Sequence, residues 1–224
     1  MSAEAGVLFE VFGFGVTSHM TTMTGITVLL GGLSYGATRN MKTNPKGLQN
    51  FMEMVVEKLE GFLTGVIGAK EARKFIPLLG TFFLFIIVSN YSGLLPGAGH
   101  LPGLAAPTSV LGVTIGLAIV TFFSTHFFGF RAHGVRYLKH IFSLNILLSL
   151  LMLIDEMVRP VSLSLRLYGN IYGEEMVASQ IAHLVPLFLP LPFMALGLLF
   201  GAVQALVLML LSSIYIHGAV GEGH

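Results

Sequence analysis

Cysteine and tryptophan are absent from the sequence, and charged residues make up only 10% of its 224 positions. The lack of cysteine excludes disulfide bonds, thiolate metal sites and cysteine nucleophiles. Soluble domains contain about 25% charged residues. The low charge content, with 54% hydrophobic residues and a mean hydropathy of +0.82, therefore argues against a water-soluble fold. The formal net charge of +1 gives no basis for binding nucleic acid.

Three long stretches of the chain contain no charged residue: 11–38, 75–130 and 176–221. Each is longer than the roughly 20 residues that a helix needs to cross a bilayer. The N-terminus is acidic and lacks the basic region of a secretory signal. We therefore expect an all-α polytopic membrane protein, inserted through internal spans and forming a single membrane domain over residues 1–224.

Hydrophobic runs, helical periodicity and glycine or proline breaks predict six helical segments. Over 46–70, apolar residues recur at helical spacing with glutamates between them, as in an amphipathic helix on a membrane surface. As a helix, 140–183 is about 66 Å long, roughly twice the hydrocarbon thickness, so it must be steeply inclined or bent, with Pro160 as the candidate bend. The six segments are a first span at 11–37, a surface amphipathic helix at 46–70, a second span at 75–95, a third span at 109–130, a long inclined helix at 140–183 and a last inclined helix at 192–217.

Basic residues cluster in two segments. Ten of the twelve lysines and arginines lie in 39–74 and 131–139, which the predicted spans place on the same side of the membrane. Cytoplasmic loops are enriched in Lys and Arg. We therefore expect both segments and the C-terminus to be cytoplasmic, with the N-terminus on the opposite side.

Arg166 lies deep within an apolar helical segment. An arginine near the middle of a membrane costs at least about 2.5 kcal/mol on insertion scales, and the distance to both ends of the segment makes snorkelling awkward. Ser162, Asn170 and Glu174 share its i, i+4 spacing, which predicts a polar stripe along one helix face. The stripe indicates a function at that face, with a structural ion pair as the alternative for Arg166.

Other titratable side chains lie near this stripe. Glu175 follows Arg166 by nine residues, which is half a turn net, and so points away from it. Glu174, Glu175 and His183 are candidates for a proton relay, because imidazole titrates near neutral pH. An interfacial hydrogen bond explains His183 equally well. The histidines are scattered without the spacing of a metal site, so no metal is expected.

Pairs of glycines four residues apart allow helices to approach closely in lipid. Three such pairs occur: Gly112 and Gly116, Gly169 and Gly173, and Gly197 and Gly201. The second pair borders Arg166, and the third is followed by Gln204, whose amide is costly to leave unpaired in lipid. Ordinary helix packing explains these pairs equally well.

The sequence has neither a phosphate-binding Gly-x-x-x-x-Gly-Lys-Ser/Thr motif nor a nucleophile elbow. We therefore expect no catalytic site within this chain and no cofactor. Any energy coupling must come from partners.

The segment around Arg166 closely resembles a motif of one known family. The motif reads Arg159-Pro160-Val161-Ser162-Leu163-Ser164-Leu165-Arg166-Leu167-Tyr168-Gly169-Asn170, followed by Glu175 and Gln204-Ala205. The resemblance extends over most of the chain beyond about Lys42, through Asn90, Leu94-Leu95-Pro96, Pro107 and Thr114. The sequence resembles the a subunit (subunit 6) of F-type rotary ATP synthases.

This resemblance implies a proton-translocating subunit of the membrane Fo sector, with two offset aqueous half-channels. Arg166 would face the ion-binding carboxylate of each passing c subunit, flanked by Asn170 and Gln204. The expected partners are the c-subunit ring, the b-subunit peripheral stalk, the rest of the F1Fo ATP synthase and the lipid bilayer. We expect a bacterial inner membrane, and H⁺ rather than Na⁺ as the commoner ion.

The resemblance also implies residues for each half-channel. Glu175, with Glu174 and His183, would serve the half-channel that opens to the non-cytoplasmic side. Ser162 and Asn90 are further half-channel candidates.

On the cytoplasmic side, relatives often carry an acidic residue where this chain has Met152. Asp155 and Glu156, about one turn later, are the candidates to replace it. Some relatives also have an aspartate where this chain has Gly93, so the contact made by that aspartate is not predicted for this chain.

Glu174 and Gly197 occupy positions that vary together in the family. Glu174 is accordingly expected to be the titratable group of this pair.

Two other classes of function stay open at this point. A secondary transporter or channel with its own site near Arg166 and Glu174 would also explain intramembrane charges, but no inverted repeat is evident. A noncatalytic anchoring subunit would explain the glycine pairs and leave Arg166 unexplained. Copurification with a c ring would distinguish an ATP synthase a subunit from both a transporter and an anchoring subunit.

Overall fold

The computed structural model describes residues 7–11, 14–95, 103–134, 137, 146–184 and 190–221. Helices dominate this part of the chain, and the predicted all-α polytopic membrane architecture is confirmed. The elements are β1 Val7–Val11, β2 Phe14–Thr17, α1 Ser18–Thr38, α2 Leu48–Ile67, α3 Ala69–Ser92, the 3₁₀ turn η1 Pro107–Ser109, α4 Leu111–His133, α6 Ile146–Leu184 and α7 Pro190–Gly221.

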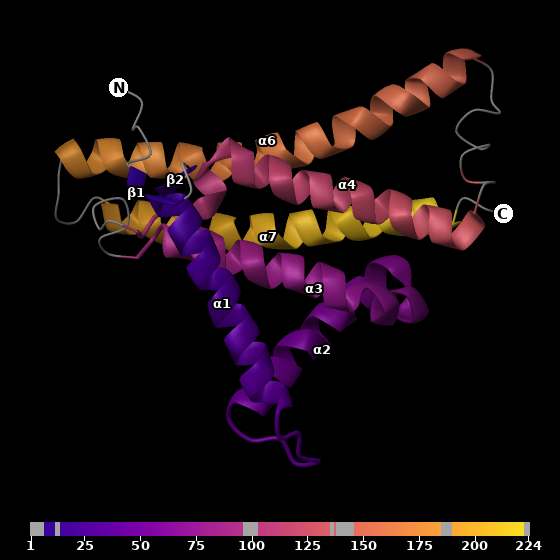
Figure 1. Cartoon of the computed structure of the whole chain (residues 1–224), viewed down its shortest axis with the longest axis horizontal. Helices are drawn as coiled ribbons and strands as arrows, with labels where there is room; N and C mark the ends of the chain where they lie inside the picture. The colour runs from indigo at the N-terminus through magenta and orange to yellow at the C-terminus, as the bar shows by residue number, and fades with distance from the viewer. Residues whose placement is uncertain are drawn as a thin grey trace.

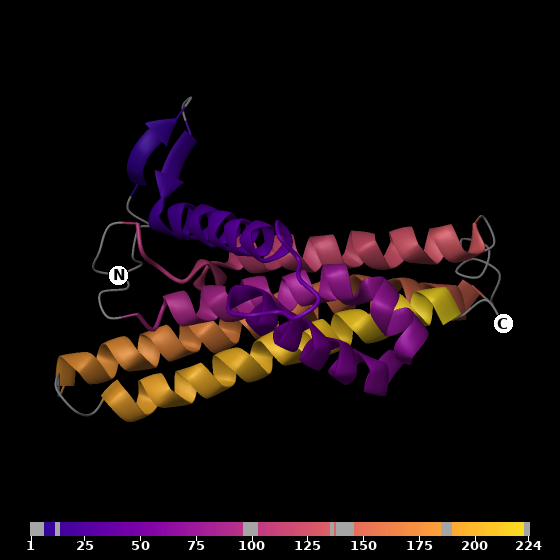
Figure 2. The same ribbon diagram turned by 90° about the horizontal axis from the view of Figure 1, so that it is seen from below.

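Four helices, α3, α4, α6 and α7, run side by side and form the body of the molecule (Figure 1). Helix α1 crosses the direction of these four, and α1 and α2 together form a V that projects from the body. Seen from below, the β1–β2 hairpin stands off the helices at the start of α1 (Figure 2). Within the described residues, α3, α4 and Pro192–Gly221 of α7 are long and apolar enough to cross a membrane.

Two clusters of buried side chains hold the helices together. The first joins α3, α4, α6 and α7, and includes Ile86, Ala118, Leu163, Leu167, Ile171 and Leu208. The second joins α2, α3 and α7, and includes Leu59, Leu63, Phe75, Leu79, Met209 and Ile216. Between helices in lipid the driving force is van der Waals packing rather than expulsion of water, so these contacts fix which helix faces meet.

The N-terminal region differs from the sequence-based expectation of one span over 11–37. Residues up to Thr17 form the antiparallel hairpin of β1 and β2, and α1 begins only at Ser18. β-branched and aromatic residues favour extended structure, which explains the hairpin around Val7, Phe9 and Phe14. With 21 residues, α1 is about 31 Å long, close to the hydrocarbon thickness.

Other boundaries shift by a few residues. Gly68, at a φ of 82°, separates α2 from α3, so the surface helix expected over 46–70 ends at Ile67 and the next helix begins at Ala69. The first part of the helix expected over 140–183 lies outside the described residues. From Ile146 onward α6 is continuous through Pro160 for 39 residues, or about 58 Å, and therefore cannot stand upright in a bilayer.

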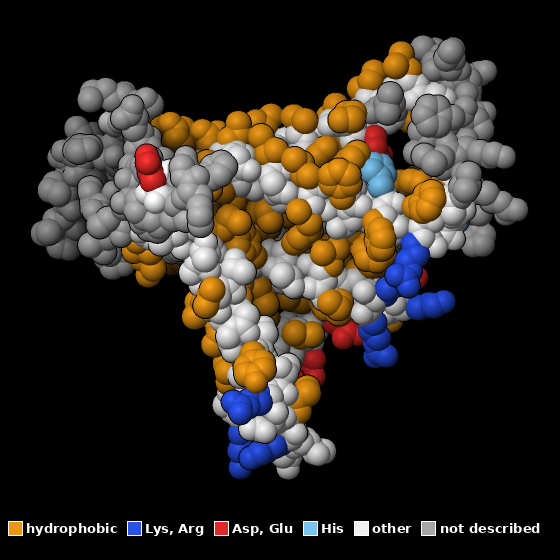
Figure 3. Space-filling model, viewed as in Figure 1, with side chains coloured by type: hydrophobic (Ala, Val, Ile, Leu, Met, Phe, Trp, Pro, Cys, Tyr) orange, Lys and Arg blue, Asp and Glu red, His pale blue; other side chains and the backbone are white. Residues whose placement is uncertain are grey.

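Surface chemistry agrees with a membrane environment. Hydrophobic side chains cover much of the visible face over α4, α6 and α7 (Figure 3). Lysine and arginine side chains gather at the tip of the V and near the junction of α2 and α3. Helix α2 buries one side through Leu59, Leu63 and Ile67, as an amphipathic helix does.

Candidate functional site

Arg166 projects from the outer face of α6. Its side chain and those of Ser162 and Asn170 are exposed, whereas Leu163 and Leu167 on the inward face are buried. Among the described residues, Arg166 has neither a hydrogen bond nor an ion pair. A guanidinium has five N–H donors, so a partner for it in an apolar environment must come from outside this part of the chain.

The surface beside Arg166 is open at the backbone. A Cβ atom added at Gly169 or at Gly173 would meet nothing within 4 Å. The pair Gly169 and Gly173 therefore does not pack α6 against a helix that the structure describes. They leave room for another helix to approach α6 closely.

Glu174 does not lie on the polar stripe that its i, i+4 spacing predicts. Each step of four residues advances about 40° beyond a full turn, so twelve residues after Ser162 the side chain has rotated toward α7. Glu174 is half-buried there, and its carboxylate lies against Gly197. A methyl group at Gly197 would overlap the Glu174 carboxylate, so the absence of a side chain at 197 makes this position available to Glu174.

Glu175 lies on another side of α6, beside the end of α3 and η1. The side chain of Ser109 lies near its carboxylate, and the Ser109 hydroxyl donates a hydrogen bond of 2.9 Å to the Ala106 carbonyl oxygen. A Cβ atom added at Gly93 would lie 3.2 Å from Glu175 Oε1 and 2.8 Å from Ala106 Cβ. Glycine at 93 therefore gives the Glu175 carboxylate its space.

Asn90 joins three elements next to these acids. Its side chain is 3% exposed, and Nδ2 donates a hydrogen bond of 3.0 Å to the Gly201 carbonyl oxygen of α7. Its Oδ1 accepts one of 2.8 Å from Thr108 of η1. Gln204, three residues after Gly201, is also buried, and its Nε2 has no acceptor among the described residues. Asn90 thus brings polar chemistry to the α3–α7 contact, and Gln204 adds a second buried amide on α7.

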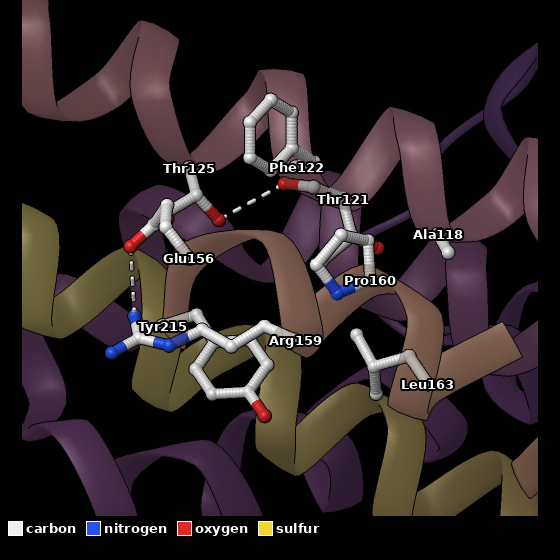
Figure 4. A pocket seen from close by; sticks show the side chains of 9 residues that line it. All are labelled: Ala118, Thr121, Phe122, Thr125, Glu156, Arg159, Pro160, Leu163 and Tyr215. Atoms are coloured by element: carbon white, nitrogen blue, oxygen red, sulfur yellow. Dashed lines mark hydrogen bonds and ion pairs between the residues drawn. The ribbon is translucent and has the colours of Figure 1, made fainter. Parts of the chain in front are cut away.

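A second polar cluster lies toward the other end of α6. Arg159 Nη2 is 2.6 Å from Asp155 Oδ2, and Arg159 Nη1 is 3.5 Å from Glu156 Oε2. The guanidinium also stacks over the Tyr215 ring of α7, 5.0 Å from its centroid. Figure 4 shows Arg159 between Glu156 and Tyr215, at the wall of a pocket that α4, α6 and α7 line.

His126 of α4 completes this cluster. Its Nε2 lies 3.5 Å from Glu156 Oε1, and its Nδ1 is hydrogen-bonded to Tyr137 Oη at 2.9 Å. No role was predicted from the sequence for His126, Arg159, Tyr137 or Tyr215. The i, i+4 spacing of Asp155 and Arg159 was a usable signal, but the approach of α4 to α6 has no signature in local spacing.

Arg166 lies between the two polar clusters along α6. Glu156 precedes it by ten residues and Glu174 follows it by eight, or about 15 Å and about 12 Å along a helix. His183 lies in the last turns of α6, and its side chain is outside the described part of the structure.

Comparison of the sequence with known proteins identifies its family. The family model described as ATP synthase A chain matches residues 19–217. The chain belongs to the ATP synthase A chain family.

Relatives in this family are similar over nearly the whole chain. ATP synthase subunit a of Trichlorobacter lovleyi is 43% identical, covering 100% of this chain and 96% of the relative. ATP synthase subunit a 2 of Syntrophotalea carbinolica is 41% identical, covering 94% and 88%. Subunit a of Gloeobacter violaceus is 40% identical, covering 91% and 83%. The resemblance to the F-type ATP synthase a subunit is thereby confirmed, as is the prediction of an integral membrane subunit of the ATP synthase complex.

Proposed function

We propose that this subunit conducts protons through the Fo sector, with Arg166 facing the ion-binding carboxylates of a c-subunit ring. Proton flow past Arg166 would be coupled to rotation of the ring and so to ATP synthesis. The b-subunit peripheral stalk and the rest of the F1Fo complex are the further partners that we propose.

The exposed Arg166 of α6, which has no hydrogen bond or ion pair among the described residues, is the observation that carries the proposal. A charge in this position costs at least about 2.5 kcal/mol in a bilayer, so an external partner must offset that cost. The open backbone at Gly169 and Gly173 allows a partner helix to bring a carboxylate to within reach of the guanidinium.

Two half-channels on either side of Arg166 fit the distribution of acidic groups. Toward the non-cytoplasmic side we propose Glu174 and Glu175, supported by Asn90, Gln204 and His183. Their neighbours Gly197 and Gly93 leave space for the two carboxylates. Arg166, with Ser162 and Asn170 beside it, would separate this half-channel from the cytoplasmic one.

Toward the cytoplasmic side we propose Asp155 and Glu156. These acids lie near the α4 end that carries Arg131, and the basic segments 39–74 and 131–139 would be cytoplasmic by the positive-inside rule. The N-terminus would then lie on the opposite side and the C-terminus in the cytoplasm. The bacterial sources of the similar proteins support a bacterial inner membrane, and we propose H⁺ as the ion.

ATP-driven acidification of inverted vesicles that carry Arg166→Ala tests this proposal. We expect pumping to vanish while copurification shows an assembled complex. Arg73→Ala is the matched control, because Arg73 is an exposed arginine paired with Glu60 at 2.9 Å, and pumping there should persist. Wild-type pumping by an assembled Arg166→Ala complex would refute the proposed role of α6.

A further inference from the structure

We propose that His126 relays protons between Glu156 and the cytoplasmic aqueous phase. This inference rests on the proposed function of the α6 acids as a cytoplasmic half-channel. It adds a residue from α4, a helix to which the half-channel proposal assigns nothing.

The ring of His126 bridges two oxygen-bearing side chains through its two nitrogens. Nε2 faces Glu156 Oε1 at 3.5 Å, and Nδ1 contacts Tyr137 Oη at 2.9 Å. An imidazole can accept a proton on one nitrogen and release one from the other. The arrangement therefore provides a path from the Glu156 carboxylate across the ring to the C-terminal side of α4.

Partial exposure of both side chains fits the relay. The side chains of His126 and Glu156 are 26% and 24% exposed, so neither is sealed in the helix packing. Figure 3 shows a histidine next to an acidic side chain on the face over α4 and α6. Pro160 lies in the same pocket wall. Because proline has no N–H to pair with the carbonyl four residues earlier, the Glu156 backbone oxygen is left free as a further acceptor for water.

Arg159, and not His126, holds the Glu156 carboxylate in place. Arg159 already pairs with both Asp155 and Glu156, and Tyr215 stacks on the guanidinium. His126 is therefore not needed to hold the Glu156 carboxylate in place. The edge contact between His126 and Phe122, with centroids 4.2 Å apart, orients the ring.

Proton exit takes place in two transfers. The protonated Glu156 carboxyl gives its proton to Nε2 of neutral His126, leaving a carboxylate and an imidazolium. The imidazolium gives the proton on Nδ1 to water beside Tyr137, which leaves as hydronium. Exchange with water then returns the neutral ring to its starting tautomer. Transfer in the opposite direction reverses these steps.

Passive proton flux through the full Fo sector in vesicles, after removal of F1, tests the relay. We expect His126→Ala and His126→Gln to lower the flux about tenfold, because water replaces a positioned base poorly. Free imidazole should restore flux to His126→Ala, and the variants should lose the rise in flux with pH that a histidine relay confers. His133→Gln is the matched control, since His133 on the same helix binds the Val220 carbonyl oxygen at 2.7 Å and has no ion pair with an acidic side chain among the described residues.

Unchanged flux in His126→Gln, or a loss in His126→Ala that imidazole does not restore, would overturn the relay. If His126→Ala does not assemble, the more conservative His126→Gln decides through its flux and pH profile. Arg166→Ala, assayed in parallel, separates the two proposals. Loss of pumping there with normal flux in His126→Gln removes only the relay, whereas full pumping by Arg166→Ala removes the half-channel on which the relay depends.

Discussion

Replacing Gly197 with alanine should force Glu174 out of its position. The new methyl group would occupy the volume of the Glu174 carboxylate. Position 197 is buried at the contact between α6 and α7, so the backbone has little freedom to retreat. The flexible Glu174 side chain, which is only half-buried, must move instead.

The expected cost follows from two opposing effects. Alanine is favoured over glycine inside a helix by about 0.5–1 kcal/mol. Overpacking of a close contact costs about 1–3 kcal/mol, and the flexibility of glutamate keeps the cost below the upper end of that range. We expect a net loss of about 1–2 kcal/mol, which corresponds to a roughly 5- to 30-fold change in the equilibrium constant.

This loss is measured by titrating the solubilised complex with SDS and following retention of the subunit on native gels. Gly197→Ala should lower the midpoint, and Gly218→Ala on the same helix, where a Cβ meets nothing within 4 Å, should not. Adding Glu174→Ala to Gly197→Ala should restore the midpoint with a coupling of about 1–2 kcal/mol. Glu174→Gln should not restore it, because the amide has the same size. Equal rescue by both substitutions would show that charge rather than volume causes the loss.

Two further predictions concern contacts elsewhere in the fold, both measured with the same SDS titration. Asn90→Ala should destabilise by about 1–2 kcal/mol, because interhelical hydrogen bonds in membranes contribute about 0.6 kcal/mol on average and up to about 1.7. Thr108→Val removes one of its two bonds and should cost about half as much; no difference from wild type in either variant would contradict the bridging role. Arg73→Ala should change stability by less than about 0.5 kcal/mol, because its ion pair with Glu60 is exposed, and a larger loss would mean that this pair is buried in the complex.

Sequence patterns predicted the helices better than their termini. Charge-free runs located the apolar helices because burial in lipid acts on every residue of a span. The same signal extended the first span to residue 11, although strand-forming residues before Ser18 fold into a hairpin. Local backbone preference decides such a boundary, and hydropathy does not report it.

Contacts between helices were the part that spacing did not predict. The three glycine pairs have the same spacing in the sequence. Of these six glycines, only Gly197 and Gly201 have side chains of neighbouring described helices within 4 Å of an added Cβ atom. Likewise, Glu156 was identified as a candidate from the resemblance, because relatives carry an acidic residue about one turn earlier. His126 is thirty residues away from Glu156 and meets it only because α4 packs on α6. Pairings of this kind depend on which helix faces meet, and periodicity within one helix carries no information about its neighbour.

The length of α6 has a consequence for the electric field across the membrane. A 39-residue helix confined to a hydrocarbon layer of about 30 Å rises only about half its length through that layer. Glu156 and Glu174, about 27 Å apart along the axis, then differ in depth by only about 14 Å. With water reaching both carboxylates, as we propose, most of the membrane voltage would fall within that short depth. A proton passing Arg166 would gain about 2.3 kcal/mol per 100 mV there, so the driving force would be concentrated on the few turns around Arg166.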